Sequence, residues 1–130
     1  MDVVIDTSVI IAVIAGEPER DGLVELTQGV NLLAPPSVHW EIGNAFSAML
    51  RRRRTTLDRV MEALELYSRV PIRFAQIDLE EAMELADHLG IYAYDAYLLA
   101  CAQRYRAPLL TLDATLRGQA ERLDIKVWEQ

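Results

Sequence analysis

The chain has 130 residues, of which 52% are hydrophobic, and a formal net charge of −7 at pH 7. This length predicts one domain, residues 1–130, with a core large enough to fold without disulfides, and the single cysteine, Cys101, suits a reducing compartment. The negative charge argues against a general nucleic-acid coat, although a local basic surface is compatible with it. The apolar run Val9–Ala15 is too short to span a bilayer, so we expect a cytoplasmic protein with no membrane segment.

The chain opens with a short run of β-branched residues that leads directly into an aspartate. Val3–Ile5 predicts a buried parallel strand, and Asp6 falls where that strand ends. A helix over 8–15 follows, which Thr7 or Ser8 can cap. Ligands of open α/β sheets bind outside the carboxyl ends of the strands, so Asp6 lies where such a fold places its chemistry. The simpler interpretation of Asp6 is a helix cap.

Strands and helices alternate along the rest of the chain. Apolar runs bounded by turn residues predict strands over 31–34, 71–75, 108–112 and 125–128. Helical spacing of apolar residues predicts helices over 19–28, 38–53, 57–69, 79–89, 96–105 and 114–123. We therefore expect an α/β fold, a three-layer sandwich around a mainly parallel sheet of about five short strands with right-handed crossovers.

Four acidic residues are predicted to meet at one edge of this sheet. Asp6 and Asp113 each follow a strand. Asp95 opens a helix, and Glu41 lies one turn into another helix, on the same side as Asn44. Carboxylates packed together repel one another unless a cation neutralises them, and Mg²⁺ or Mn²⁺ prefers oxygen ligands. The acids therefore predict a divalent metal site, although each alone could be a helix cap or a surface residue.

Such a site suits hydrolysis of a phosphodiester bond. A bound ion lowers the pKa of a water molecule and presents hydroxide to the phosphorus, and a second ion steadies the leaving oxygen. No serine, cysteine or histidine nucleophile is required. The two histidines, His39 and His88, are too far apart in the sequence to suggest a pair. His39 lies two residues before Glu41, but a solvated surface histidine is its simpler interpretation.

Four short motifs, in order, resemble those of PIN-domain ribonucleases, and in particular the VapC-type toxins of bacterial toxin–antitoxin pairs. The motifs are Val4–Ser8, Glu41–Ala45, Tyr94–Ala96 and Thr111–Asp113. The resemblance extends over the whole chain and implies a PIN-like fold with Mg²⁺- or Mn²⁺-dependent endonucleolytic cleavage of RNA. The catalytic and metal-binding residues that it implies are Asp6, Glu41, Asp95 and Asp113.

The resemblance also implies supporting residues and partners. The polar supports would be Thr7, Ser8, Asn44 and Thr111. The partners would be an RNA substrate, a second copy of the chain in a homodimer, and a cognate VapB-like antitoxin whose tail occupies the site. Some relatives carry a further acid just after the last motif, where this chain has Ala114 and Thr115, which leaves the number of metal ions open.

Surfaces for these partners are predicted less directly. A run of four arginines ends the helix over 38–53, where positive charge complements the helix dipole. The candidates for holding RNA phosphates or an acidic antitoxin segment are these four residues, Arg51, Arg52, Arg53 and Arg54. Tyr94, beside Asp95, is a candidate for stacking on RNA bases. Trp40 and Trp128 are predicted to be packing residues. The apolar helix over 57–69 is either a dimer contact or part of the core.

Two functions of other classes stay open on the residues alone. A phospho-acceptor receiver domain also gathers acids at the carboxyl edge of a parallel sheet. It needs an acidic pair after the first strand and a lysine near the last, whereas Thr7 and Ser8 follow Asp6, and the only lysine, Lys126, lies within the last predicted strand. A non-catalytic PIN-fold protein could use the acidic edge only to bind its antitoxin. The presence of all four acids argues against that loss of activity.

Overall fold

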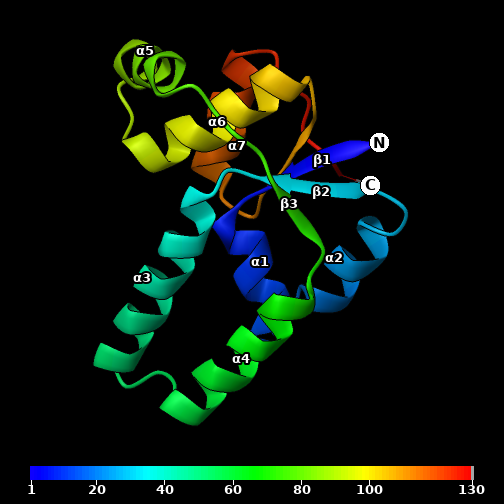
Figure 1. Cartoon of the computed structure of the whole chain (residues 1–130), viewed down its shortest axis with the longest axis vertical. Coiled ribbons are helices and arrows are strands. Elements are labelled where there is room, and N and C mark those ends of the chain that lie inside the picture. Colours follow the sequence, from blue (N-terminus) through cyan, green and yellow to red (C-terminus); the bar gives the residue numbers. More distant parts are fainter. Residues whose placement is uncertain (130) are drawn as a thin grey trace.

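Four parallel strands form a sheet through the centre of the computed structural model, which describes residues 1–129 (Figure 1). The strands are β1 (Asp2–Ile5), β2 (Asn31–Ala34), β3 (Ile72–Phe74) and β4 (Leu109–Leu110). The helices are α1 (Thr7–Ile14), α2 (Arg20–Leu26), α3 (Ser37–Arg51), α4 (Leu57–Arg69), α5 (Leu79–Leu89), α6 (Ala93–Tyr105) and α7 (Ala114–Arg122). The predicted alternation of strands and helices is confirmed, with α3 and α4 as an extra pair between β2 and β3.

Helices cover both faces of the sheet, which gives the predicted layers. In the view of Figure 1, α5, α6 and α7 lie above the sheet, and α1, α2 and α4 lie below it. The strand order is β3-β2-β1-β4, so β1 has a neighbour on each edge. Val3 and Val4 of β1 are fully buried, as is Leu109 of β4, because a parallel sheet covered on both faces has no solvated side. Asp6, which directly follows β1, therefore lies at the centre of the fold.

The fifth predicted strand, over 125–128, is reduced to an isolated bridge, so within residues 1–129 the sheet has four strands rather than five. The Leu109 N–H donates to the Lys126 carbonyl at 2.8 Å, and the Trp128 N–H donates to the Leu109 carbonyl at 2.9 Å. The strand with which this segment would pair, β4, has only two residues. Pro108 before it lacks an N–H group, and the turn at Asp113 follows soon after it, so the segment finds little strand to pair with.

Two helices begin at other residues than predicted. The helix predicted over 38–53 begins at Ser37, because Pro36 already has helical backbone angles (φ −56°, ψ −22°) and takes the cap position. The helix predicted to open at Asp95 begins at Ala93, because the extended backbone of Tyr92 is the cap. Asp95 consequently lies in the first turn of α6, where the helix dipole still favours a negative charge.

Helices α3 and α4 both bury apolar side chains in the core, and α4 leaves several of its own exposed. Val38, Ile42 and Phe46 of α3 are buried. Helix α4 packs inward through Val60 and Ala63. Three of its larger apolar side chains, which periodicity alone does not separate from the core, stay exposed: Leu57, Met61 and Leu64. Among the helices of residues 1–129, none is both long and apolar enough to cross a membrane.

The two tryptophans differ in environment. Trp128 is partly buried against the core, and its indole N–H donates to the Leu26 carbonyl at 3.2 Å, so the prediction of a packing residue is confirmed. The same prediction is wrong for Trp40, whose side chain is 69% exposed. Trp40 points outward because the neighbouring residues Glu41 and Ile42 occupy the inward positions of this turn of α3.

Candidate active site

The carboxyl edge of the sheet brings the predicted acids together. Asp6 follows β1 and Asp113 lies just beyond β4, its parallel neighbour. Glu41 and Asp95 lie near the starts of α3 and α6. The negative charges of Asp6 and Asp95 act on Glu41, and those of Asp113 and Asp6 act on Asp95. Each of the four carboxylates is therefore within electrostatic reach of at least two of the others.

Asp6 is the most enclosed of the four, with only 4% of its surface exposed. Its Oδ1 accepts hydrogen bonds from the Ser8 hydroxyl at 2.6 Å and from the Val9 N–H at 3.1 Å, and its Oδ2 accepts one from the Thr111 hydroxyl. Burial raises the pKa of Asp6 above its ordinary value, the three hydrogen bonds lower it in part, and the charge of Asp113 raises it further. Asp6 is thus both the cap of α1 and a fixed, buried carboxylate.

Ser8 and Thr111 connect Asp6 to the loop after β4. The Ser8 Oγ accepts a hydrogen bond from the Leu112 N–H at 3.1 Å while its own hydroxyl donates to Asp6. The Thr111 Oγ1 accepts one from the Asp113 N–H at 2.9 Å while its hydroxyl donates to the other Asp6 oxygen. Each hydroxyl therefore joins two segments that are more than a hundred residues apart in the sequence. Both of these predicted supports lie on the carboxylate of Asp6.

Glu41 is half-buried, and burial is the largest cause that raises the pKa of Glu41 to about 7. The Thr7 hydroxyl lowers that pKa, and the charges of Asp95 and Asp6 raise it. Within residues 1–129, the buried atoms Glu41 Oε1 and Thr7 Oγ1 nevertheless have no hydrogen bond of regular geometry. Buried polar oxygens are normally satisfied, so these two are available for a ligand.

Asp95 completes the group from the first turn of α6. It is half-buried, and its pKa is raised first by burial and then by the charges of Asp113 and Asp6. Asp113 is exposed and caps α7, its Oδ1 accepting from the N–H groups of Thr115 at 2.9 Å and Leu116 at 3.3 Å. Like charges within electrostatic reach destabilise one another, so a positive counterion would stabilise the group.

Residues 1–129 do not supply that counterion. The ion pairs between side chains of residues 1–129 involve none of the four acids. The cation nearest in sequence is Arg117 of α7, which sequence reasoning missed although it lies four residues after Asp113. Its guanidinium donates to the Thr111 carbonyl at 3.4 Å and pairs with Glu129, also at 3.4 Å, instead of with the acids. Arg117 thus braces the loop after β4.

The oxygen donors of these residues suit a divalent metal chemically, although the side chains are not yet spaced to coordinate one. In the part of the chain that the structure describes, no three acidic, histidine or cysteine side chains already lie in an arrangement that would hold an ion. The donors are all oxygen atoms, they repel one another, and the buried oxygens of Glu41 and Thr7 lack partners. Hard divalent cations select such oxygen donors, so the residues present fit Mg²⁺ or Mn²⁺.

The run of four arginines lies away from the acids. All four side chains are exposed, and at 1.5 Å per residue along α3 even the first of them is roughly 15 Å from Glu41. Arg51 is the last residue of α3, Arg52 is its C-cap, and Arg53 turns the chain in the left-handed region with a φ of 56°. The structure therefore does not bring Arg51, Arg52, Arg53 and Arg54 to the acids, because the length of α3 separates them from Glu41. That they hold RNA phosphates or an acidic antitoxin segment stays a prediction.

Asn44, a predicted polar support, and Tyr94, a predicted RNA contact, lie at the margin of the acids. Asn44 is exposed on α3, three residues beyond Glu41. Tyr94 is half-exposed beside Asp95, and its ring meets that of Tyr97 edge to face with centroids 6.2 Å apart. Of the predicted contacts to RNA or antitoxin, Tyr94 alone is adjacent in sequence to one of the acids.

Comparison with known proteins places the chain in a family. The model of the PIN domain family matches residues 3–121. The chain belongs to the PIN-domain family. PIN domains are generally nucleases, which are hydrolases. The match agrees with the resemblance of the four motifs and replaces the receiver-domain interpretation.

Solved structures share this PIN fold. The protein PAE2754 from Pyrobaculum aerophilum is similar with a TM-score of 0.68 and 21% identity, over 92% of this chain and 87% of that one. A chain of VapBC2 from Rickettsia felis, solved bound to a DNA fragment from the promoter, is similar with a TM-score of 0.68 and 15% identity, over 99% of this chain and 98% of that one. No curated protein matches this sequence. At these identities the similarity establishes the fold.

Proposed function

We propose that this PIN-domain protein is a metal-dependent endoribonuclease and the toxin of a type II toxin–antitoxin pair. The observation that carries the proposal is the group of four mutually repelling carboxylates, three of them with raised pKa values, that no cation of residues 1–129 neutralises. A partly buried cluster of this kind is costly for a merely structural role. Its cost is understandable if the cluster binds metal and substrate.

Asp6, Glu41, Asp95 and Asp113 would hold the metal. When bound, Mg²⁺ or Mn²⁺ supplies a water of lowered pKa and neutralises charge on the scissile phosphate. The chain contributes position: hydrogen bonds from Ser8 and Thr111 fix both oxygens of Asp6. Ligands oriented by such neighbours hold metals better than free ones. The oxygens of Glu41 and Thr7 that lack hydrogen-bond partners in residues 1–129 would be further donors to the metal.

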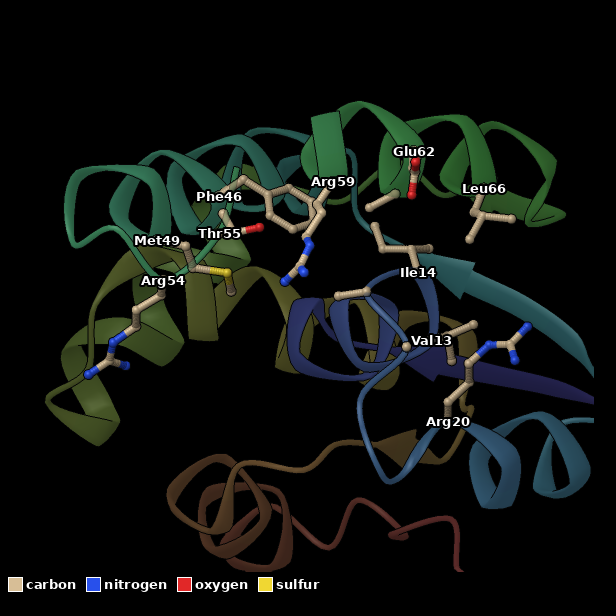
Figure 2. A pocket seen from close by; sticks show the side chains of 13 residues that line it. Val13, Ile14, Arg20, Phe46, Met49, Arg54, Thr55, Arg59, Glu62 and Leu66 are labelled. Atoms are coloured by element: carbon tan, nitrogen blue, oxygen red, sulfur yellow. The ribbon is translucent and has the colours of Figure 1, made fainter. Parts of the chain in front are cut away.

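An antitoxin would find a second surface ready for it, a groove of about 650 Å³ between α1, α3 and α4 (Figure 2). Its walls include apolar side chains such as Ile14 and Phe46, and three arginines lie around it: Arg20, Arg54 and Arg59. Figure 2 shows Arg59 directed into the space, with Arg20 and Arg54 on opposite sides. In a chain of net charge −7, this combination favours an acidic, amphipathic segment of a VapB-like antitoxin. Arg54 is too far from the acids to act there, and in this groove it would bind the acidic antitoxin segment.

Three further parts of the proposal come from the resemblance or from the sequence. The protein would be a homodimer, as the VapC-type resemblance implies. It would work in the cytoplasm, in agreement with its single buried cysteine, Cys101. Residues 1–130 would form one PIN-like domain, since the family model matches nearly the whole chain.

One assay tests the reaction and the site together. Purified protein is incubated with RNA in Mg²⁺, in Mn²⁺ and in EDTA, beside Asp6→Asn and the control Asp58→Asn, an exposed acid of α4. We expect cleavage only with metal, lost in Asp6→Asn and kept in Asp58→Asn. Cleavage that survives in EDTA and in Asp6→Asn would contradict the proposal. Tight antitoxin binding without cleavage of any RNA would favour the non-catalytic PIN-fold partner instead.

A further inference from the structure

One arginine lies beside the four acids and forms an ion pair with none of them. Arg117 follows Asp113 by one turn of α7, and its N–H donates to the Asp113 carbonyl at 3.0 Å. Its side chain donates to the carbonyl of Thr111, the residue whose hydroxyl donates to Asp6. Among the ion pairs and side-chain hydrogen bonds of residues 1–129, no other lysine or arginine side chain contacts a residue that is bonded to one of the acids. Arg117 is therefore the cation that these contacts connect to the site.

The present contacts of Arg117 are weak. Its Nη1 lies 3.4 Å from Oε2 of Glu129, and its Nη2 donates to the Thr111 carbonyl, also at 3.4 Å. The side chains of Arg117 and Glu129 are 41% and 62% exposed, and ion pairs as exposed as this one contribute little to stability. Within residues 1–129 the buried Nε of Arg117 has no hydrogen-bond partner, although buried N–H groups are normally paired. A stronger anion can therefore displace Glu129.

A pocket beside Arg117 has room for such an anion. It has a volume of about 370 Å³ and lies between α2, the loop after β4 and the C-terminal segment. Thr111, which donates to Asp6, belongs to its lining. Within the described chain, Arg117 is the only cation of this lining, and Glu19 and Glu129 are its acids. A group bound to Arg117 in this pocket would therefore lie against the residue that holds Asp6.

The chemistry of the site indicates which anion this would be. RNA presents a phosphate at every nucleotide, and a chain of net charge −7 with an acidic cluster repels it unless a cation is near. Arginine binds phosphate through two parallel N–H donors, in charge-assisted hydrogen bonds that are stronger than a single exposed contact at 3.4 Å. A phosphate of the RNA therefore competes effectively with Glu129 for Arg117.

We propose that Arg117 binds a phosphate of the RNA next to the acids, and that Glu129 pairs with this arginine until the RNA displaces it. The inference rests on the proposed function, since it takes RNA as the ligand of this edge of the sheet. It adds a phosphate contact that the four carboxylates cannot make themselves. Glu129 is then an internal competitor that weakens the binding of RNA.

Fluorescence anisotropy of a short, labelled single-stranded RNA of random sequence measures the dissociation constant in EDTA, so that binding is separated from cleavage. The test variants are Arg117→Gln, which keeps a donor for the Thr111 carbonyl without the charge, Glu129→Gln, and the double variant. The matched controls are Arg122→Gln and Glu121→Gln, exposed residues of α7 whose substitution changes the net charge equally. Circular dichroism and urea titration establish that each variant folds.

At low ionic strength we expect Arg117→Gln to raise the dissociation constant by about tenfold relative to Arg122→Gln. The slope of its logarithm against the logarithm of the salt concentration should fall by about one, because one phosphate is no longer neutralised. Glu129→Gln should lower the dissociation constant by about two- to fivefold more than Glu121→Gln does. This gain should disappear in the double variant, since Glu129 competes with RNA only through Arg117.

Equal affinities of Arg117→Gln and Arg122→Gln for RNA would overturn the phosphate contact, as would a wild type that binds no RNA at low salt. A gain from Glu129→Gln that persists in the double variant would show that Glu129 only repels RNA, and would refute the competition. Binding that depends on Arg117, in a protein that cleaves no RNA with Mg²⁺, would count against the nuclease alone. Cleavage with no contribution of Arg117 to binding would count against this inference alone.

Discussion

Asp6 and Asp113 share one local design and have different environments. Each follows a strand, and each caps a helix with its Oδ1. Asp6 follows the central strand β1 and is nearly inaccessible to water, whereas Asp113 lies beyond the short strand β4 and is exposed. The comparison teaches that the sequence pattern sets the cap, while the position of the strand in the sheet decides whether the carboxylate also carries the cost of burial.

We expect the largest difference in RNA cleavage between the two aspartates when the charge of each carboxylate is removed in turn. Asp6→Asn loses a buried, oriented oxygen and should lower RNA cleavage by more than about a hundredfold, beyond the range for residues that only support a metal ligand. Asp113→Asn should lower it less, because an exposed side chain is replaced in part by water. Initial rates at saturating Mg²⁺ measure both. Equal losses would show that burial does not rank the two aspartates.

A change next to Asp6 should have the next largest effect. Thr111→Val keeps the side-chain volume but removes the hydroxyl that donates to Asp6 Oδ2 and accepts from the Asp113 N–H. An unsatisfied buried acceptor costs about 1–3 kcal/mol of unfolding free energy, and cleavage should fall by about 10- to 100-fold.

Urea titration and RNA cleavage measure these losses. The control is Thr115→Val, which alters an exposed threonine of α7 whose N–H, not its hydroxyl, binds Asp113. A Thr111→Val protein as stable and active as Thr115→Val would show that the hydrogen bond does not support Asp6.

Glu41 extends the comparison to pH, because its pKa rises from an ordinary 4.5 to about 7 in the folded protein. Between these two values the folded state holds the proton more tightly than the unfolded state, so in EDTA the wild type loses stability as pH rises through this window. The full shift would amount to about 3 kcal/mol for a fully buried group, and partial exposure of Glu41 reduces this to about 1–2 kcal/mol.

Glu41→Gln removes the titration and should therefore be more stable than the wild type by that amount at pH 8, with the advantage declining toward pH 5. Urea titrations across this range, with EDTA, measure it. The matched control is Glu84→Gln, an exposed glutamate of α5. If the two variants show the same pH dependence, the burial and the neighbouring charges of Glu41 do not strain the fold.

These residues show what the sequence could predict. The pattern of a strand, an acid and a helix is local, and so the positions of Asp6 and Asp113 at the carboxyl edge followed from it. The bonds that distinguish the two are not local: the Thr111 hydroxyl reaches Asp6 across 105 residues. A motif can name such residues, but their hydrogen bonds depend on which strands become neighbours.

The periodicity of apolar residues in the sequence could not predict which face of α4 is exposed, or that Trp40 is exposed. Helix α4 carries apolar residues on more than one side, and it packs through Val60 and Ala63 because alanine permits a close approach to the core. Leu64, the larger residue, then stays on the surface. Which stripe is buried depends on the distance between helices, and that distance is a property of the whole fold.

The smallest effect should separate the two roles of Asp113. Asparagine caps a helix about as well as aspartate, so Asp113→Asn should change the unfolding free energy by less than about 0.5 kcal/mol, whereas Asp113→Ala should cost about 1 kcal/mol. Urea titration in EDTA measures both. If cleavage falls in Asp113→Asn while stability does not, the loss belongs to the site and not to the cap of α7. Cleavage that is kept in Asp113→Asn and reduced only in Asp113→Ala would mean that this aspartate serves the fold alone, and that the metal site rests on the three more buried acids.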